Sequence, residues 1–273
     1  MSLRRVLLAA VGFLVCVAGA GCTRDGGPTA DPSDSAAASH SPAISLPPVG
    51  AECRELAVQG RTLRLENSAG LRLAAVDLGA GPMGVVLAHQ SDASMCQWLP
   101  YATALANLGY RVVAFDFAGF GASSPAPEKT YVEDIRTVVD YLRERGTPRV
   151  VVIGASMGAT MSVVAASTIN PPLDGVVAVS PPATFDEIDA KRAAPSLACA
   201  ALYIASTDDG DYAVYASELN DATPEPLRGL AVVDSPEHGV GLVGAQTAAG
   251  AQVRAEISDF LREHLHPSPT PTS

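Results

Sequence analysis

Residues 149–161 read Arg-Val-Val-Val-Ile-Gly-Ala-Ser-Met-Gly-Ala-Thr-Met, a run of β-branched side chains that leads into Gly-x-Ser-x-Gly. Such a continuous apolar run is typical of a strand buried on both faces, and the alanine-rich continuation favours a helix. Ser156 stands at the turn between them, where Gly154 and Gly158 leave out side chains that would collide as strand and helix close together. The turn would lift the Ser156 hydroxyl above the sheet edge, beside the N–H groups of the helix N-terminus. The stretch therefore predicts a nucleophilic serine on a strand–turn–helix unit.

Strand and helix patterns alternate along the rest of the chain. Strands are expected at 62–66, 71–77, 84–88, 111–115, 150–153, 176–179, 200–205 and 230–233. Helices are expected at 98–108, 131–145, 160–169, 212–219 and about 248–265. Turn-forming residues separate the first two strands, which we expect to be antiparallel. The remaining alternation predicts an α/β fold, a mostly parallel central sheet with helices on both faces.

A second motif lies one strand–helix unit before Ser156. Residues 116–123 read Asp-Phe-Ala-Gly-Phe-Gly-Ala-Ser. Together with Gly-x-Ser-x-Gly, this Asp-x-x-Gly-x-Gly-x-Ser loop resembles the α/β-hydrolase superfamily, and the resemblance covers about residues 71–265. It implies an α/β-hydrolase fold whose catalytic residues follow the chain order serine, acid, histidine, at the carboxyl ends of the strands.

The segment between residues 180 and 196 is short. Many α/β-hydrolases insert a lid after the corresponding strand, which here ends at Val179. In this chain, residues 185–193 leave room for only a short helix. The resemblance therefore implies a minimal lid and a comparatively open site.

The expected chain order leaves one histidine as the candidate base. A serine hydroxyl needs a base at neutral pH, usually an imidazole oriented by a carboxylate. His238 follows the last expected strand, where the superfamily places its catalytic histidine. The other histidines precede Ser156 or close the last helix: His40, His89, His264 and His266.

The candidate acid lies in a cluster after the strand 200–205. The superfamily pattern at this point is a strand, a short spacer and an aspartate, which matches Asp209. Asp208 is the alternative, and Asp211 is better placed to cap the next helix. We therefore take Ser156, Asp209 and His238 as the expected catalytic residues.

Two backbone N–H groups are the candidate donors to the substrate oxyanion. Met157 follows the nucleophile and supplies one of them. The other belongs to the loop after the strand 84–88, where Gln90 replaces the glycine that usually follows the histidine. The N–H of Ser91 is the first choice here, and that of Gln90 is the alternative.

The N-terminus has the features of an export signal. Two arginines, an apolar run and four small residues precede Cys22. This pattern resembles the lipobox of bacterial lipoproteins, in which the chain is cut before a lipidated cysteine; a plain secretory peptide is the alternative. We expect a signal peptide at 1–21, a lipidated Cys22 with a disordered tether at 22–50, a hydrolase domain at 51–265 and a disordered tail at 266–273. The protein would then be exported and held by its lipid on the extracytoplasmic side of the cell membrane.

Composition narrows the remaining classes of function. The net charge is −11, and the chain has no basic run, which argues against nucleic-acid binding. Cysteine and histidine spacing suggests no zinc site, and no cofactor-binding loop is apparent, so we expect no cofactor. An exported protein can hold one disulfide among Cys53, Cys96 and Cys199, and the pair Cys53–Cys96 is the candidate.

These features predict a serine hydrolase that cleaves small or medium acyl esters through an acyl-enzyme. A thioesterase, peptidase, lipase or acyltransferase would use the same residues. A non-catalytic surface binding protein is the alternative outside catalysis, because the fold also hosts inactive members.

Overall fold

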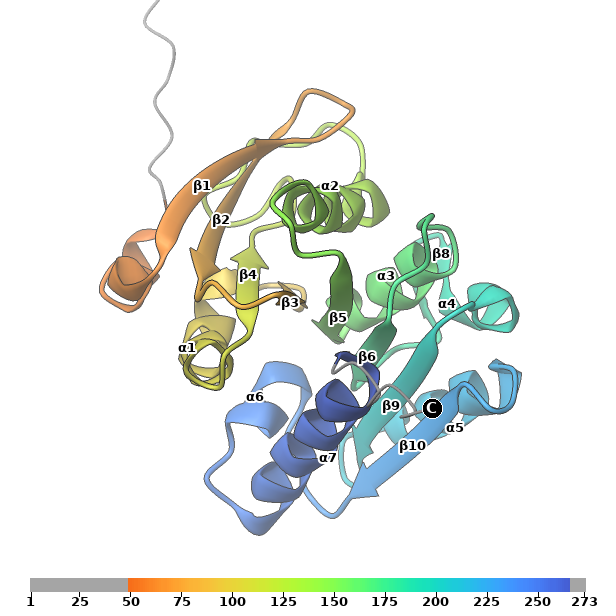
Figure 1. The fold of residues 1–273 in the computed structure, drawn as a ribbon. Coiled ribbons are helices and arrows are strands. Elements are labelled where there is room, and N and C mark those ends of the chain that lie inside the picture. The colour runs from red at the N-terminus through yellow and green to blue at the C-terminus, as the bar shows by residue number, and fades with distance from the viewer. Residues whose placement is uncertain (1–48, 266–273) are drawn as a thin grey trace, which may run out of the picture. The chain divides into compact units, whose positions relative to one another are not determined.

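The computed structural model describes residues 49–265 (Figure 1). The expected signal peptide, Cys22, the tether as far as residue 48 and the tail at 266–273 lie outside the described residues. Within the described part, no helix is long and apolar enough to cross a membrane.

The described residues form an eight-stranded sheet with the order β1-β2-β4-β3-β5-β6-β9-β10. Strand β1 pairs antiparallel with β2, which pairs antiparallel with β4, and all other neighbours in this sheet are parallel. The strands are β1 (Arg61–Glu66), β2 (Arg72–Leu78), β3 (Met83–Ala88), β4 (Arg111–Phe115), β5 (Arg149–Ala155), β6 (Gly175–Val179), β9 (Ala200–Ser206) and β10 (Arg228–Val233). The mostly parallel sheet that the alternating pattern predicts is therefore confirmed.

Helices cover both faces of the sheet (Figure 1). They are α1 (Leu99–Asn107), α2 (Tyr131–Glu144), α3 (Met157–Ala166), α4 (Ala190–Ala193), α5 (Tyr212–Ala222), α6 (Gly239–Gly244) and α7 (Ala248–Leu265). Single turns of 3-10 helix occur at η1 (Ala51–Cys53), η2 (Leu56–Gln59), η3 (Met95–Trp98) and η4 (Ala194–Ser196). Helices α1 and α2 end just before Gly109 and Gly146, whose φ angles of 96° and 81° suit glycine.

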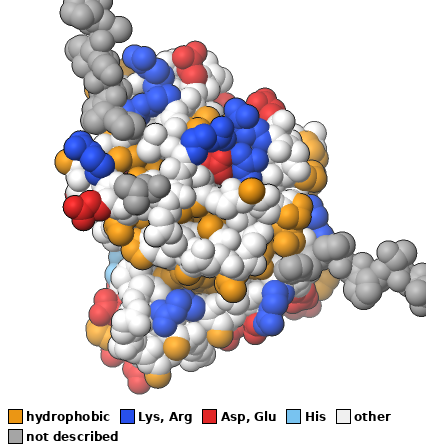
Figure 2. Space-filling model, turned by 60° about the vertical axis from the view of Figure 1, so that its left-hand side comes forward, with side chains coloured by type: hydrophobic (Ala, Val, Ile, Leu, Met, Phe, Trp, Pro, Cys, Tyr) orange, Lys and Arg blue, Asp and Glu red, His pale blue; other side chains and the backbone are white. Residues whose placement is uncertain are grey.

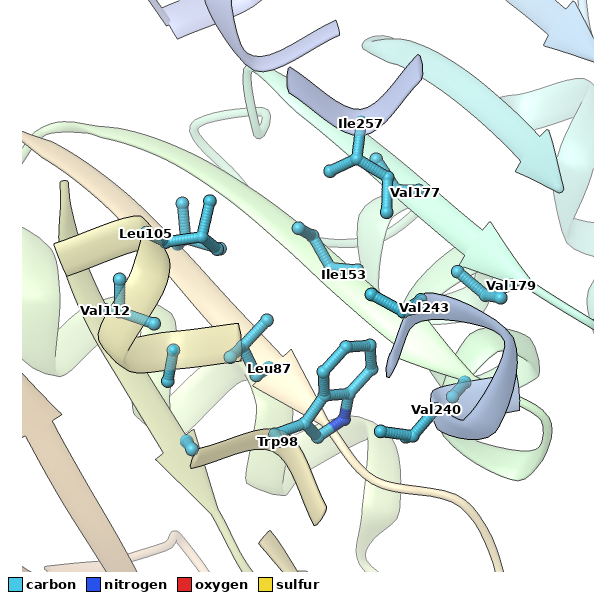
Figure 3. Packing of buried hydrophobic residues seen from close by; sticks show 14 of the residues in the cluster. Leu87, Trp98, Leu105, Val112, Ile153, Val177, Val179, Val240, Val243 and Ile257 are labelled. Carbon is cyan, nitrogen blue, oxygen red and sulfur yellow. The ribbon is translucent and has the colours of Figure 1, made fainter. Parts of the chain in front are cut away.

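Two hydrophobic cores lie on the two faces of the sheet. Along β5, Ile153 faces α1, α6 and α7, whereas Val152 faces α2 to α5. Figure 3 shows the first core, in which Ile153 and Val177 from the sheet point toward Ile257 of α7. Because side chains alternate along a strand, a β-branched run fills both cores at once, which is why 149–155 contains no polar side chain after its first residue.

The segment after β6 differs from the expectation. In place of a helix over 185–193, a two-stranded hairpin comes first, with β7 (Thr184–Phe185) paired antiparallel to β8 (Ile188–Asp189). Helix α4 then begins at Ala190, with the Asp189 side chain accepting a hydrogen bond from the N–H of Arg192. Phe185 and Ile188 have the spacing of one helical turn, so periodicity alone did not separate the two structures.

The surface that Figure 2 shows mixes charges of both signs. The buried carboxylate of Asp77, on β2, contacts Arg61 of β1 at 2.9 Å and Arg111 of β4 at 2.7 Å, and it accepts a hydrogen bond from the Tyr141 hydroxyl. Burial would raise the pKa of Asp77, but hydrogen bonds from Arg111, Tyr141 and Arg61 outweigh it and lower the pKa. These arginines therefore balance a buried charge.

Candidate active site

Ser156 lies in a strained turn between β5 and α3. Its φ and ψ are 49° and −118°, a region that side chains other than glycine rarely adopt. The N–H of Ser156 donates to the Val179 carbonyl of β6 at 2.9 Å, which fixes the turn to the end of the sheet. The residue is 5% exposed. The strained strand–turn–helix geometry that Gly-x-Ser-x-Gly predicts is present.

The two glycines of the motif are required by close contacts. A Cβ on Gly154 would lie 2.2 Å from the carbonyl oxygen of Gly158, so the first turn of α3 packs directly on β5. A Cβ on Gly158 would lie 2.5 Å from the carbonyl oxygens of both Ala88 and His89. The first turn of α3 therefore also touches the end of β3, and this contact brings the loop after β3 beside Ser156.

His238 and Asp209 contact each other across two neighbouring strand ends. Nδ1 of His238 lies 2.7 Å from Oδ2 of Asp209. Because an ionised carboxylate only accepts hydrogen bonds, Nδ1 carries the proton and Nε2 is left as the basic nitrogen. The side chains of His238 and Asp209 are 29% and 12% exposed, so the pair is partly shielded from water yet reachable.

The structure distinguishes Asp209 from its neighbours. Asp208 is exposed, and its N–H donates to the Ser235 carbonyl, which joins the loops that follow β9 and β10. This bond fixes the turn so that the next carboxylate, that of Asp209, reaches His238. Asp211 stands at the N-cap position of α5, as expected, but its side chain makes no capping hydrogen bond.

The loop that carries His238 packs against the Ser156 turn. The N–H of Gly239 donates to the Ser180 hydroxyl at 3.0 Å, and Ser180 follows Val179, which binds Ser156. A Cβ on Gly239 would lie 3.5 Å from the Cβ of Ala155, the residue before Ser156. His238 therefore lies beside the turn that carries the serine, and the φ of 54° at Gly239 suits glycine there.

Two further contacts hold the His238 loop, one at its backbone and one at the imidazole ring. The Ser206 hydroxyl, at the end of β9, donates to the Glu237 carbonyl at 2.7 Å. The ring of Tyr212, at the start of α5, lies 4.5 Å from the imidazole of His238, measured between ring centroids. The sequence pattern gave no indication of either contact, because both depend on how the loops meet.

His89 orients the loop that carries the second candidate oxyanion donor. Its imidazole is fully buried, and Nδ1 lies 2.7 Å from the Gln90 carbonyl, while the Phe117 N–H donates to Nε2 at 3.1 Å. Burial lowers the pKa of His89 to about 4, so the ring is neutral, with its proton on Nδ1. The N–H and C=O of a trans peptide point in opposite directions, so the N–H of Ser91 points away from the His89 ring.

The two candidate donors are available. Among the described residues, neither the N–H of Met157 nor that of Ser91 has a hydrogen-bond acceptor. Met157 begins α3, where the N–H groups of the first turn have no partner in the helix. Both N–H groups are therefore left without a partner in the described residues, as the expectation for oxyanion donors requires.

Gln90 connects this loop to the loop that carries His238. Its side-chain Oε1 accepts a hydrogen bond from the Val240 N–H, at the start of α6, at 3.0 Å. The side chain also lies against Gly239, where a Cβ would be 2.4 Å from the same oxygen. The residue that departs from the usual glycine thus joins the loop after β3 to the loop that carries His238, a contact that the sequence did not indicate.

The cysteines of the described residues are not part of the site around Ser156. Cys53 and Cys96 form a disulfide that joins η1 to η3, in agreement with the candidate pair. Cys199 is free and buried, and burial raises the pKa of its thiol to about 12. In the part of the chain between residues 49 and 265, no three histidine, cysteine, aspartate or glutamate side chains are grouped to hold a metal ion.

The sequence matches known proteins over its central part. A family model described as "alpha/beta hydrolase fold" matches residues 85–197. Bifunctional epoxide hydrolase 2 of Mus musculus is 36% identical over 95 residues, 34% of this chain and 17% of that protein. A putative non-heme chloroperoxidase of Synechocystis sp. is 37% identical over 101 residues, 36% of this chain and 35% of that protein. The aligned region thus spans about a third or less of the length of these relatives.

Solved structures resemble the chain over most of its described length. An esterase of Pyrococcus furiosus matches with a TM-score of 0.64 and 19% identity, covering 78% of this chain and 94% of that one. An esterase of Thermogutta terrifontis has a TM-score of 0.62 and 18% identity, covering 76% and 100%. An enol-lactonase of Burkholderia xenovorans has a TM-score of 0.60 and 17% identity, covering 73% and 99%. The chain therefore has the α/β-hydrolase fold, and that prediction is confirmed.

Proposed function

We propose that the protein is a serine hydrolase that cleaves carboxylic esters of small or medium acyl groups. The observation that carries this proposal is the Asp209–His238 hydrogen bond, in a loop that packs against the strained turn of Ser156. The fold and its likeness to esterases support the same assignment.

In the proposed reaction, the Ser156 hydroxyl oxygen attacks the acyl carbon while Nε2 of His238 takes its proton. Asp209 holds Nδ1–H and stabilises the imidazolium that forms. The N–H groups of Met157 and Ser91 bind the oxyanion of the tetrahedral intermediate. Nε2–H then protonates the leaving alcohol, and a water molecule activated by the same nitrogen releases the acid from the acyl-enzyme.

The chemistry of a serine nucleophile favours an ester over an epoxide. A serine oxygen that opened an epoxide would form an alkyl ether, which has no carbonyl carbon for water to attack. An acyl-enzyme has such a carbon and turns over. Several sequence relatives are epoxide hydrolases. We nevertheless assign Ser156 to ester hydrolysis, in which the acyl group passes from the serine to water.

The short segment after β6 supports a preference for small acyl groups. The two-residue strands of the β7–β8 hairpin, the four-residue helix α4 and η4 are the only elements between β6 and β9. A cover of this size offers little apolar surface to enclose a long acyl chain, whose burial would contribute about 0.8 kcal/mol per methylene group. Short acyl chains have few methylene groups to bury, so the small cover reduces their binding energy least.

A panel of p-nitrophenyl esters tests the proposal on the purified protein. We expect kcat/KM to be highest for acetate and butyrate and to fall for octanoate and palmitate, and Ser156→Ala to lower kcat by at least about 10³-fold. Ser167→Ala, at the far end of the same helix, is the matched control. Thioester and anilide substrates, and added methanol as an acyl acceptor, distinguish the related activities. No hydrolysis by a folded sample would favour a binding protein instead.

We also propose that the protein is exported and anchored through a lipid on Cys22. The Cys53–Cys96 disulfide supports an oxidising compartment outside the cytoplasm. Metabolic labelling with a clickable palmitate should mark the wild-type protein in the membrane fraction, and Cys22→Ser should abolish the label and release the protein. Equal labelling of both would contradict the assignment of Cys22.

A further inference from the structure

Exposed apolar side chains gather at one open edge of the sheet. Strand β10 is the last strand, and among the described residues no strand pairs with its outer side (Figure 1). Leu230 and Val232 are each 40% exposed, and Val214 of α5, which packs on β10, is 56% exposed. These are three of the five large hydrophobic side chains that are exposed in residues 49–265.

Alternation along β10 places four side chains on one face. Ala231 and Val233 are buried in the core beneath α7. The residues between and beside them therefore face the α5 side of the sheet: Arg228, Leu230, Val232 and Asp234, here named the β10 stripe. The contact of the Arg228 side chain with the Asp221 carbonyl at the end of α5 agrees with this direction.

The same alternation leaves backbone groups free at the edge. The carbonyls of Leu227 and Val233 accept hydrogen bonds from the β9 side, from Ala201 and Thr207. Odd-numbered residues of β10 therefore turn their backbone groups toward β9, and the N–H and C=O of Arg228, Leu230 and Val232 turn outward. These groups are available to an added strand.

The β10 stripe is complementary to the β10 stripe of a second copy that runs in the antiparallel direction. Antiparallel pairing about Ala231 places Leu230 opposite Val232 of a second copy, and Arg228 opposite Asp234 of that copy. Within its own chain Arg228 also contacts Glu225 and Asp221, and the Asp234 carboxylate accepts a hydrogen bond from the Thr207 hydroxyl, so the pairing across the axis would add to these contacts. Both pairs join residues whose backbone groups turn outward, so each pair can exchange two hydrogen bonds. The apolar pairs lie at the centre and the opposite charges at the ends.

We propose that two copies of the protein associate through β10 to form one continuous sheet across a twofold axis at Ala231. The interface is isologous, since each copy contributes the same β10 stripe. The opposite edge shows how a sheet avoids such pairing: β1 carries Arg61, Arg64 and Glu66.

Sedimentation equilibrium of the full-length protein tests the proposal. The wild-type protein should have the mass of a dimer, and Val232→Lys, which places an unpaired charge at the centre, should weaken dimerisation by at least about 30-fold. Leu108→Lys is the matched control, because Leu108 is 68% exposed at the end of α1 and should leave the mass unchanged. A monomeric wild-type protein, or a Val232→Lys dimer of unchanged affinity, would overturn the proposal.

Charge reversal tests the register. Arg228→Asp and Asp234→Arg should each weaken the dimer, and the double variant should restore it, because the reversed pair again joins opposite charges. Thermal unfolding of each variant separates a folding defect from a loss of association. Single variants that dimerise like the wild type, or a double variant no better than either single one, would overturn this register.

Discussion

The buried imidazole of His89 should make the stability of the protein depend on pH. The ring is fully buried between the loops after β3 and β4, and burial lowers its pKa from 6.5 to about 4. The unfolded chain therefore binds a proton between these two values while the folded chain does not. Because the folded pKa is the lower one, stability is full above pH 6.5 and falls as the pH drops toward 4.

The magnitude follows from the two pKa values. A difference between 6.5 and about 4 corresponds to a total loss of about 3 kcal/mol, at about 1.4 kcal/mol per pKa unit. Between pH 7 and pH 5, a range in which most carboxylates stay ionised, the free energy of unfolding should fall by about 2 kcal/mol from this group alone.

Urea unfolding measures this loss, and the protein contains its own probe. Trp98 is the single tryptophan of the chain and is fully buried, so its fluorescence reports unfolding. His89→Gln can keep the acceptor for the Phe117 N–H, and His89→Asn can keep the donor to the Gln90 carbonyl. Both side chains are neutral at every pH, so in both variants the dependence between pH 7 and pH 5 should be smaller by about 2 kcal/mol.

The comparison between wild type and variants cancels the contributions of all other groups. If the wild-type protein and both variants lose the same free energy of unfolding between pH 7 and pH 5, His89 is not a neutral buried group. The orientation derived for the loop that carries Ser91 would then also be wrong.

Three further changes have defined outcomes. Asp209→Asn should lower kcat by about 10³–10⁴-fold with little effect on KM, whereas Asp208→Asn should not, in ester kinetics; equal losses would refute the assignment of the acid. Gln90→Met should lower kcat on the order of 10-fold because the two loops lose their link, and Gln90→Glu, which keeps an acceptor, should lose less; an unchanged kcat in Gln90→Met would contradict this. Replacing Cys53 and Cys96 with alanine should lower the free energy of unfolding by about 4 kcal/mol, the chain-entropy value for a separation of 43 residues, and an unchanged urea midpoint would contradict it.

Local patterns in the sequence were sufficient for most of the fold. A β-branched run such as 149–155 fills two cores at once, a pattern typical of a strand buried on both faces. Two helices end before Gly109 and Gly146, where the positive φ angles make the endings visible in the sequence. These features depend on neighbouring residues alone, so they are predictable from a single chain.

Elements held by distant contacts were not predictable. Helix α6 is glycine-rich and has low helix propensity, yet Leu242 and Val243 are buried and Gln90 accepts a hydrogen bond from its first turn. The β7–β8 hairpin turns at Asp186, whose φ of 53° is unusual for a residue other than glycine. Neither element has a periodicity of its own long enough to detect.

In the candidate site, too, some residues were predictable from local sequence patterns and others depend on contacts between distant segments. Ser156 and His238 follow from motif and chain order, but spacing alone left Asp208 and Asp209 as alternatives. The structure separates them by the contact of Asp209 with His238, and these two residues lie in loops after different strands. The link from Gln90 to Val240 spans 150 residues of sequence, and no local pattern indicates it.

Covalent labelling of Ser156 tests the central claim most directly. The purified protein would be treated with a fluorophosphonate, digested and analysed by mass spectrometry, beside Ser156→Ala and a heat-unfolded sample. An activated serine should give a single adduct on the peptide that contains Ser156, absent from both controls. A folded wild-type sample without an adduct, or an adduct on another serine, would contradict the proposed function.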